Sequence, residues 1–336
     1  MKIERKIFPG HIIEYPYPLF YDEKDKALFY DENYSFQIPL IKIFELKNAV
    51  INQHTVMSDW KVQDQFLRHN KINILNRVKR LIQISIQTQI RRKKVILGYQ
   101  VWGNNYFHWM TETLPAIITM NQCNVEAMVM LPESLHRVSF VRDALCMLSF
   151  KYEFFNDKQA VKTESLFAIP IPHVGRFHHT YMHQTAKVLK NSAGVVEGIV
   201  PYRRVYITRS NARRRKVSNE VELIEFLRKY DFEIHKLEDY TIKEQIHLFH
   251  EAAIVLSNHG AGLTNIMFMN EGSRVLELKS AQNNYWCFFS LANVFGLQYG
   301  YQLCSSTNLN HREADIFVDL FNLSFRLTEL LQKSVG

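Results

Sequence analysis

A glycine-containing loop in the second half of the chain has the residue types of an anion-binding site. It reads SNHGAGLTN over residues 257–265 and lies between an apolar stretch, typical of a buried parallel strand, and a helical pattern. Glycine removes Cβ atoms where a phosphate needs the backbone close, and a helix start offers N–H groups and a positive dipole end. The loop lacks the third glycine of the dinucleotide fingerprint and the Gly-Lys-Ser/Thr of a Walker loop. It predicts a phosphate site, with a tight strand-to-helix turn without a ligand as the alternative.

Arginines follow the first predicted strand of the same half, residues 205–208. Thr208 ends that strand, and Arg209 and the basic run 213–216 come after it. We expect these side chains beside the glycine loop, because parallel strands end at the same sheet edge. Arginine can hold a phosphate through two parallel hydrogen bonds. Glu277, the one acid in the strand pattern 275–279, is a candidate acceptor for ribose or sugar hydroxyls. The ligand-binding residues predicted at this edge are Thr208, Arg209, Arg213, Asn258, His259, Gly260, Ala261, Gly262, Leu263, Thr264, Asn265 and Glu277.

A histidine and a glutamate are placed one helical turn apart in the first half. His108 and Glu112 lie in NNYFHWMTETLPA, residues 104–116, whose pattern predicts a helix. A histidine can take a proton from a hydroxyl near neutral pH while the acid holds its charge state, so the pair is a candidate general base. A half-buried histidine with satisfied hydrogen bonds is the alternative, and two ligands are too few for a metal site. The residues expected to line the space beside the pair are Asn105, Trp109, His173, Arg176 and His179.

Strand and helix patterns alternate along most of the chain and predict an α/β fold with parallel sheets covered by helices. The first 70 residues form a β-rich segment of short strands, and a Rossmann-like alternation starts near residue 95. Two glycines and a proline break the pattern at residues 192–201. We therefore predict two Rossmann-like domains, 1–195 and 196–336, with ligands at the carboxyl ends of their strands.

Helix signals are clearest in the second predicted domain. Asn219 with Glu222, and Thr241 with Glu244, have the spacing of capping boxes. The last helix is predicted over residues 315–332 and is a candidate to pack back on the first domain.

The charge of the chain indicates an anionic partner. Its 336 residues include 41 Lys and Arg against 33 Asp and Glu, a net charge of +8. Two acid-free basic runs lie within residues 77–94 and 203–216. The first fits a helix from about residue 73, either facing the core with a solvated back or lying as a basic amphipathic helix on an anionic membrane. Nucleic acid explains the charge less well, because the chain has no stacking-aromatic signature of an RNA-reading sheet.

The composition is that of a folded globular protein, with 47% apolar and 22% charged residues. No stretch approaches the ~18 consecutive apolar residues of a membrane span, and the first residues lack the apolar core of a secretory signal. The four cysteines lack zinc-like spacing, so we expect reduced packing residues. These features predict a cytoplasmic protein.

Three ordered motifs resemble the family 61 glycosyltransferases. They are NYFHWMTETLP, YITRSNARRR and SNHGAGLTNIMFMNEGSRVLEL, all within residues 99–280. The family includes enzymes that add N-acetylglucosamine to EGF-like domains, plant xylosyltransferases, and many bacterial capsule and lipopolysaccharide proteins. By motif position, His108 and Glu112 match the family's amino-terminal His and Glu, Arg209 its arginine after the strand, and residues 259–265 its donor loop.

The resemblance implies a GT-B fold, in which two Rossmann-like domains face a cleft, and inverting transfer from a nucleotide-activated sugar, usually a UDP-sugar. The missing apolar leader departs from the secretory-pathway members of the family. It favours a bacterial, cytosolic-face enzyme of surface polysaccharide synthesis, with a glycan or lipid-linked saccharide as acceptor and peripheral contact with the inner face of the plasma membrane. The lining residues beside His108 would then be on the acceptor side. The donor sugar, the linkage, the oligomeric state and the choice of His108 or Glu112 as base stay open.

The chain has no D-x-D pair that would hold a metal ion. The charge of a departing nucleoside diphosphate would then be met by Arg209, the basic run after it and the helix start at Gly262. We therefore predict catalysis without an essential divalent cation and with no cofactor besides the donor. A sugar-phosphate transferase of capsule assembly is the enzymatic alternative, and a basic nucleic-acid-binding protein is the non-enzymatic one.

Overall fold

The computed structural model describes residues 2–21, 25, 35–68, 72–172, 175–306 and 313–332. The chain divides into two compact units, one of residues 1–11 and 38–192 and the other of residues 12–37 and 193–336. The second unit therefore takes up residues 12–37, which the sequence pattern had assigned to the first domain. Backbone pairing explains this, because Leu19 N donates to Tyr299 O at 2.8 Å and the Phe20 ring packs in the second core.

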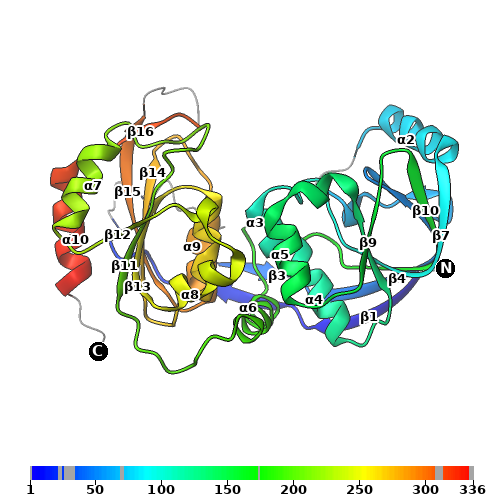
Figure 1. Cartoon of the computed structure of the whole chain (residues 1–336), viewed down its shortest axis with the longest axis horizontal. Coiled ribbons are helices and arrows are strands. Elements are labelled where there is room, and N and C mark those ends of the chain that lie inside the picture. Colours follow the sequence, from blue (N-terminus) through cyan, green and yellow to red (C-terminus); the bar gives the residue numbers. More distant parts are fainter. Residues whose placement is uncertain are drawn as a thin grey trace. The chain divides into compact units, whose positions relative to one another are not determined.

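The first unit is built on a mixed eight-stranded sheet with the order β6-β5-β4-β10-β7-β8-β9 and with β1 paired to β4 (Figure 1). Strands β10, β7, β8 and β9 are parallel, whereas β4 is antiparallel to β10, β1 and β5. The expected Rossmann-like sheet is thus correct for four strands only, because the β-rich first segment joins the same sheet. The strands are β1 (Lys2–Phe8), β4 (Ile41–Asn52), β5 (Thr55–Ser58), β6 (Lys61–Val62), β7 (Thr88–Leu97), β8 (Met128–Pro132), β9 (Tyr152–Phe155) and β10 (Gln159–Ala168).

Helices complete the first unit. A separate two-stranded sheet pairs β2 (His11–Glu14) with β3 (Ser35–Ile38), and apart from the end residues His11 and Ile38 it belongs to the second unit. Gly98 ends β7 where its backbone passes close to β8, since a Cβ there would lie 2.9 Å from Met130 O. The helices are α2 (Ile74–Ile86), α3 (Tyr106–His108), the π-helix η3 (Trp109–Thr113), α4 (Leu114–Gln122), α5 (Ser139–Met147), α6 (His179–Ala193) and the 3₁₀ turns η2 (Asp64–Phe66) and η4 (Glu133–Arg137).

The second unit is a doubly wound sheet with the order β12-β11-β13-β14-β15-β16, parallel except for β16. Helices α7 and α10 cover one face and α8 and α9 the other (Figure 1). Because the order reverses between β11 and β13, the switch point lies at their carboxyl ends. The elements are β11 (Arg203–Ile207), α7 (Glu220–Arg228), β12 (Glu233–His235), η5 (Leu237–Asp239), α8 (Ile242–His250), β13 (Ala252–Asn258), the 3₁₀ helix η6 (Ala261–Phe268), β14 (Arg274–Ser280), α9 (Cys287–Val294), β15 (Gln298–Ser306), β16 (Ile316–Phe317) and α10 (Leu320–Gln332).

The last helix packs within the second unit, against α7. Leu323, Leu327 and Leu330 of α10 share one buried cluster with Leu223 and Leu227 of α7. Leucines at this helical spacing form one apolar stripe, and the sheet face beside α7 is the apolar surface that buries it.

One of the two predicted capping boxes is present. Thr241 accepts from Glu244 N, and the Glu244 carboxylate accepts from Thr241 N, so that prediction is confirmed. Asn219 occupies the N-cap of α7 without capping it. Its side chain instead donates to and accepts from the Val318 backbone, at 2.9 Å in both bonds. This tertiary contact replaces the local box predicted with Glu222.

Candidate active site

A break in helix geometry positions His108 and Glu112 after the carboxyl end of β7. Asn105 caps α3 by accepting from Phe107 N at 3.0 Å. Leu114 N then donates to Trp109 O, five residues back, which makes residues 109–113 a π-helix. Pro115 lacks the N–H that would bond the carbonyl four residues earlier, so it favours such a bulge at this point. π-bulges recur at functional sites.

The histidine and the glutamate form a hydrogen-bonded pair with a third side chain behind them. His108 Nδ1 lies 2.9 Å from Glu112 Oε1, and Gln100 Nε2 donates to Glu112 Oε2 at 2.7 Å. Gln100 is held in turn by Trp102 N, which donates to its Oε1 at 2.8 Å. The carboxylate is buried and the imidazole half-buried. This geometry favours the tautomer with a proton on Nδ1, which leaves the lone pair on Nε2 for proton transfer.

The residues expected beside this pair differ in their burial and in their contacts. Trp109 is fully buried and packs in the core, which argues against the acceptor contact that we predicted. Asn105 serves as the helix cap. Trp102 was not predicted, yet it is 53% exposed and its ring stacks on His108 with centroids 6.3 Å apart. It lies in a loop without periodicity, so no sequence pattern singled it out.

The segment that contains the predicted Arg176 and His179 packs against the same helix. The Phe177 ring contacts that of Phe107, and burial and then the nearby Glu112 charge raise the pKa of Tyr181. Arg176 is half-buried, and the His179 ring lies 5.5 Å from that of His11. The predicted His173 falls outside the described residues.

In the second unit the structure brings the glycine loop and Arg209 together at the switch point. The loop follows β13 and Arg209 follows β11, which are neighbours in the sheet. A Cβ on Gly260 would lie 2.7 Å from the Arg209 Cζ, so glycine is what admits the guanidinium onto the loop. Gly260 is also the N-cap residue of η6, whose first N–H groups point to the same edge.

A second arginine, Arg215, stands beside Arg209. The Arg209 guanidinium donates to Arg215 O at 3.4 Å and Arg214 O at 3.3 Å, and Asn258 Nδ2 also donates to Arg215 O. Burial, and then the charge of Arg215, lower the pKa of Arg209; burial likewise lowers the pKa of Arg215. A bound anion would relieve the repulsion between these two half-buried cations. The predicted Arg213 is exposed instead. Because basic residues fill the whole run, the sequence does not indicate which arginine side chain turns inward.

Buried polar atoms mark the inner wall of this edge. Within the described residues, Asn258 Oδ1, Thr264 Oγ1 and Arg215 Nε have no hydrogen-bond partner although solvent does not reach them. Buried polar groups are rarely left unsatisfied, and functional sites hold many of the exceptions. The three atoms come from β13, η6 and the basic run, the three segments that meet at the switch point.

Glu277 lies behind the loop, and protein groups contact both of its carboxylate oxygens, which argues against the direct ligand contact that we predicted. Its carboxylate is fully buried, with Oε1 on His259 Nδ1 and Oε2 accepting from the Tyr299 hydroxyl. Burial raises the pKa of Glu277, but His259 and Lys279 more than offset it, so the pKa is lowered overall. Burial lowers the pKa of Lys279 most, against the pull of Glu277. Glu277 therefore positions the His259 ring and offsets the positive charge of the buried Lys279.

Several other predicted residues support the loop from within. Leu263 and Asn265 are fully buried, and Asn265 Nδ2 donates to Gln245 Oε1 at 2.7 Å. The Thr208 hydroxyl donates to Glu220 Oε1 at 2.8 Å. Ala261 and Gly262 remain half-buried at the start of η6, where a ligand can reach their backbone.

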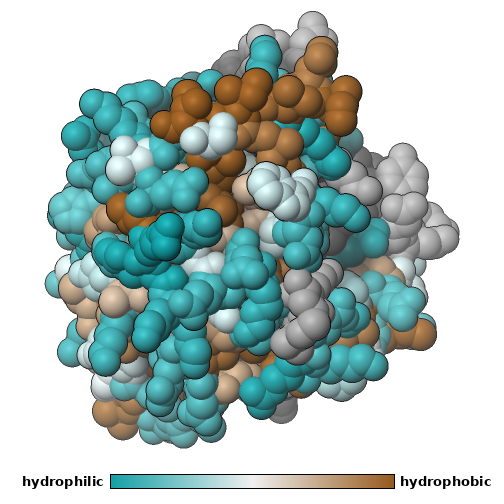
Figure 2. All heavy atoms as spheres, turned by 90° about the vertical axis from the view of Figure 1, so that its right-hand side faces the viewer, coloured by the Kyte–Doolittle hydropathy of each residue, from teal (hydrophilic) through white to brown (hydrophobic). Residues whose placement is uncertain are grey.

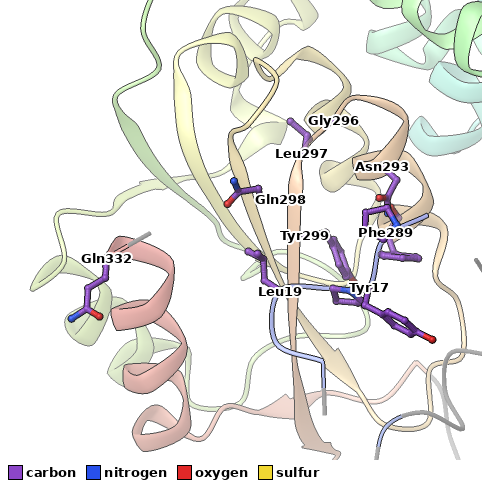
Figure 3. A pocket seen from close by; sticks show the side chains of 11 residues that line it. Tyr17, Leu19, Phe289, Asn293, Gly296, Leu297, Gln298, Tyr299 and Gln332 are labelled. Atoms are coloured by element: carbon purple, nitrogen blue, oxygen red, sulfur yellow. The ribbon is translucent and has the colours of Figure 1, made fainter. Parts of the chain in front are cut away.

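The second unit also has a hollow that lies away from this edge. It has a volume of about 710 Å³, and the Tyr17, Phe289 and Tyr299 rings gather at one end of it (Figure 3). Gly296 to Tyr299 place it at the amino end of β15, whereas the glycine loop follows the carboxyl end of β13. Because parallel strands share their ends, the hollow is at the opposite edge from the arginines.

The described residues lack two kinds of feature. No group of three or more His, Cys, Asp or Glu side chains there is arranged to hold a metal ion. Among the described helices, none combines the length and the apolar character that crossing a bilayer demands. All four cysteines are free thiols, and Cys146 is exposed, so the packing role expected of it is wrong.

A doubly wound sheet with arginines and a glycine loop at its switch point has features typical of proteins that bind phosphorylated ligands. Residues 106–276, half of the chain, match the family model described as glycosyltransferase 61. The chain therefore belongs to the glycosyltransferase 61 family, which confirms the resemblance of its motifs.

Curated relatives share a shorter region. The chain is 32% identical over 101 residues to the EGF domain-specific O-linked N-acetylglucosamine transferase of Gallus gallus, and 31% identical over 101 and 102 residues to those of Canis lupus familiaris and Mus musculus. Each match covers 29% of this chain and 19% of the relative. The chain thus spans about a fifth of the length of these relatives.

Proposed function

We propose that this protein is an inverting glycosyltransferase that moves a sugar from a nucleotide-activated donor, a UDP-sugar, to a hydroxyl of a glycan or lipid-linked saccharide. A GT-B arrangement of its two units and a role in surface polysaccharide synthesis are parts of the proposal. The observation that carries it is the arginine pair on the glycine loop at the switch point of the second unit, in a chain of the glycosyltransferase 61 family.

The donor side supplies charge stabilisation. Arg209 and Arg215 would hold the two phosphates, and the backbone at Gly260 to Gly262 would add N–H donors from the start of η6. The negative charge of the leaving nucleoside diphosphate grows as the glycosidic bond breaks. Fixed cations that are already partly desolvated stabilise that charge more in the transition state than in the ground state.

The acceptor side supplies the base. In the proposed reaction, the acceptor hydroxyl oxygen attacks the anomeric carbon as its proton moves to His108 Nε2, and the diphosphate leaves from the opposite face. Glu112 orients the imidazole and stabilises the imidazolium that forms, with Gln100 holding the carboxylate. Single displacement inverts the anomeric configuration. Glu112 is essential in this scheme as the positioning group.

The first donor to test is UDP-N-acetylglucosamine, since the curated relatives are named as N-acetylglucosamine transferases. A panel of UDP-sugars should raise the melting temperature of the protein, and the bound donor should be slowly hydrolysed. Arg209→Ala should abolish the stabilisation, while the exposed Arg213→Ala should retain it. If no UDP-sugar stabilises or is turned over by the unmutated protein, the proposal fails.

Metal independence and the product distinguish the remaining alternatives. We expect turnover to persist in EDTA, because arginines take the place of a cation at the diphosphate. Loss of all activity in EDTA with recovery on adding Mn²⁺ would contradict this. A product that retains a phosphodiester would instead identify a sugar-phosphate transferase.

A further inference from the structure

Helix α2 presents its apolar side chains to solvent. Its outward stripe has exposed fractions between 48% and 78%, and Ile84 alone among the helix residues is buried. Residues at such positions share one helical face. The hypothesis of a core-facing helix with a solvated back is therefore wrong. The stripe consists of Ile74, Leu75, Val78, Ile82 and Ile86.

Polar contacts hold α2 in this orientation. Arg77 Nη2 lies 2.9 Å from the buried carboxylate of Asp64, and the Arg80 guanidinium donates to His54 O. Ile84 packs inward, against Val50 and Ala160. Rotation of the helix to bury its stripe would break this ion pair and leave Arg68, 3.4 Å from the other carboxylate oxygen, as the remaining ionic partner of the buried Asp64, which is costly. The outward stripe is thus a fixed feature of the fold.

Basic side chains lie on the sheet face that α2 covers. Ile84 packs on Val50 of β4, Val50 pairs with Lys162 of β10, and Lys162 pairs with Arg91 of β7. Paired residues of neighbouring strands point to one face, and so does Lys93, two residues along. They border a hollow of about 190 Å³ with four cations and one acid, lined by Asn48, Arg91, Arg92, Lys93, Lys162, Thr163 and Glu164.

We propose that the stripe of α2 and this basic face dock on the surface of an anionic lipid bilayer. Apolar residues gather at the top of the face shown in Figure 2, where α2 lies. Such a stripe can enter the acyl boundary while lysines and arginines meet anionic headgroups. From residue 65 to 111 the sequence has nine Lys and Arg and no Asp or Glu, so nothing in this stretch repels an anionic surface.

Other occupants fit the surface less well. A second copy docked by the same stripe would bring two basic faces together, because a two-fold contact places like surfaces against each other. Nucleic acid would leave five aliphatic side chains in water, and the stripe offers no aromatic ring for base stacking. An anionic membrane satisfies both the apolar and the basic residues.

Vesicle flotation with the full chain tests the proposal independently of the reaction. The protein should float with vesicles of phosphatidylcholine and phosphatidylglycerol but not with phosphatidylcholine alone, and salt should weaken the binding. The variant Leu75→Gln/Ile82→Gln/Ile86→Gln should lose at least about ten-fold in partitioning at an unchanged melting temperature, because all three side chains are exposed. Val221→Gln/Phe325→Gln is the matched control on exposed apolar residues of α7 and α10 and should bind as before.

A charge variant separates this docking from simple hydrophobic adsorption. Arg91→Gln/Lys93→Gln/Lys162→Gln should lower partitioning to the anionic vesicles by about five-fold for each residue. Equal binding to neutral and anionic vesicles, or unchanged binding of either variant, would overturn the proposal. A dimer in sedimentation velocity that the stripe variant dissociates, without vesicle binding, would assign the stripe to a second copy instead. Both variants should bind the donor as the unmutated protein does. A failure of donor binding in the unmutated protein would therefore contradict the proposed function and leave the docking proposal unaffected.

Discussion

Two histidine–carboxylate pairs show how burial gives the same two residue types different tasks. In both pairs, Nδ1 of the histidine meets a buried carboxylate. The His108 side chain is half-buried and therefore within reach of a substrate hydroxyl, and its ring stacks beside that of the exposed Trp102. His259 is buried, and burial lowers its pKa despite the attraction of Glu277. The first pair suits proton transfer, and the second holds the glycine loop in place.

Replacement of Glu112 by glutamine keeps the shape of the first pair and removes its charge. We expect turnover to fall by about 10² to 10⁴-fold, because the imidazolium loses its counter-charge, with donor affinity nearly unchanged. The acidic limb of the rate–pH profile, where the base is protonated, should also move to lower pH, because the imidazolium loses its counter-charge. Parallel losses in donor affinity and turnover, with an unchanged pH profile, would contradict a positioning role in catalysis.

The arginine pair gives a prediction within one short run of sequence. Arg215→Ala should weaken binding of UDP by about ten-fold or more, because a charge-assisted contact to a phosphate is lost. Arg213→Ala removes the same charge from an exposed position and should change the dissociation constant little. Calorimetric titration of both variants measures the difference; equal losses would mean that the run acts only through its overall charge.

At the scale of elements, long-range contacts decide how helix ends are held. Asn219 joins the start of α7 to the segment after β16 through two hydrogen bonds to Val318. Thr241 of α8 caps its helix locally and is exposed to solvent. The two helix starts look alike in sequence, but only one of them links parts of the chain about 100 residues apart.

Asn219→Ala should therefore cost more stability than Thr241→Ala. We expect the free energy of unfolding to fall by about 2–3 kcal/mol for Asn219→Ala, since it leaves two buried Val318 groups unsatisfied, and by about 1 kcal/mol for Thr241→Ala. Urea unfolding followed by circular dichroism compares the two. Similar losses would show that Asn219 acts as an ordinary cap.

At the scale of the whole molecule, the buried histidines make stability depend on pH. Burial, and then the neighbouring His11, His183 and His178, lower the pKa of His179 to about 4. The unfolded chain binds this proton near pH 6.5 and the folded chain near pH 4. Between these values the unfolded state carries more protons, so acid favours unfolding, and stability rises with pH until it levels off above about 6.5.

We therefore expect the melting temperature to fall by several degrees from pH 7.5 to pH 5. His179→Gln should reduce this slope, because it removes one group that must stay neutral in the folded state. Differential scanning calorimetry across this range is the measurement. A melting temperature that rises toward pH 5 in the unmutated protein would contradict the assignment.

Local sequence patterns indicate some residues of the candidate site but not others. The glycine loop, Arg209 and the His108–Glu112 spacing were found from local patterns, because each depends on residues near one another in the chain. Arg215, Trp102 and Gln100 were missed, since their importance depends on which way a side chain turns. Glu277 was placed correctly on its strand, but its burial, and hence its supporting task, required the neighbouring strand and helix.

The sequence by itself determined the α/β alternation, the switch-point motifs and the family, because periodicity, turn chemistry and motif spacing are written along the chain. The tertiary structure decided that residues 12–37 join the second unit, that the last helix stays in it and that α2 faces outward. The amphipathic pattern of α2 is the same whether its stripe is buried or exposed. Contacts with distant residues fix which side turns to the protein: Arg77 pairs with the buried Asp64, Arg80 donates to His54 O, and Ile84 packs on Val50.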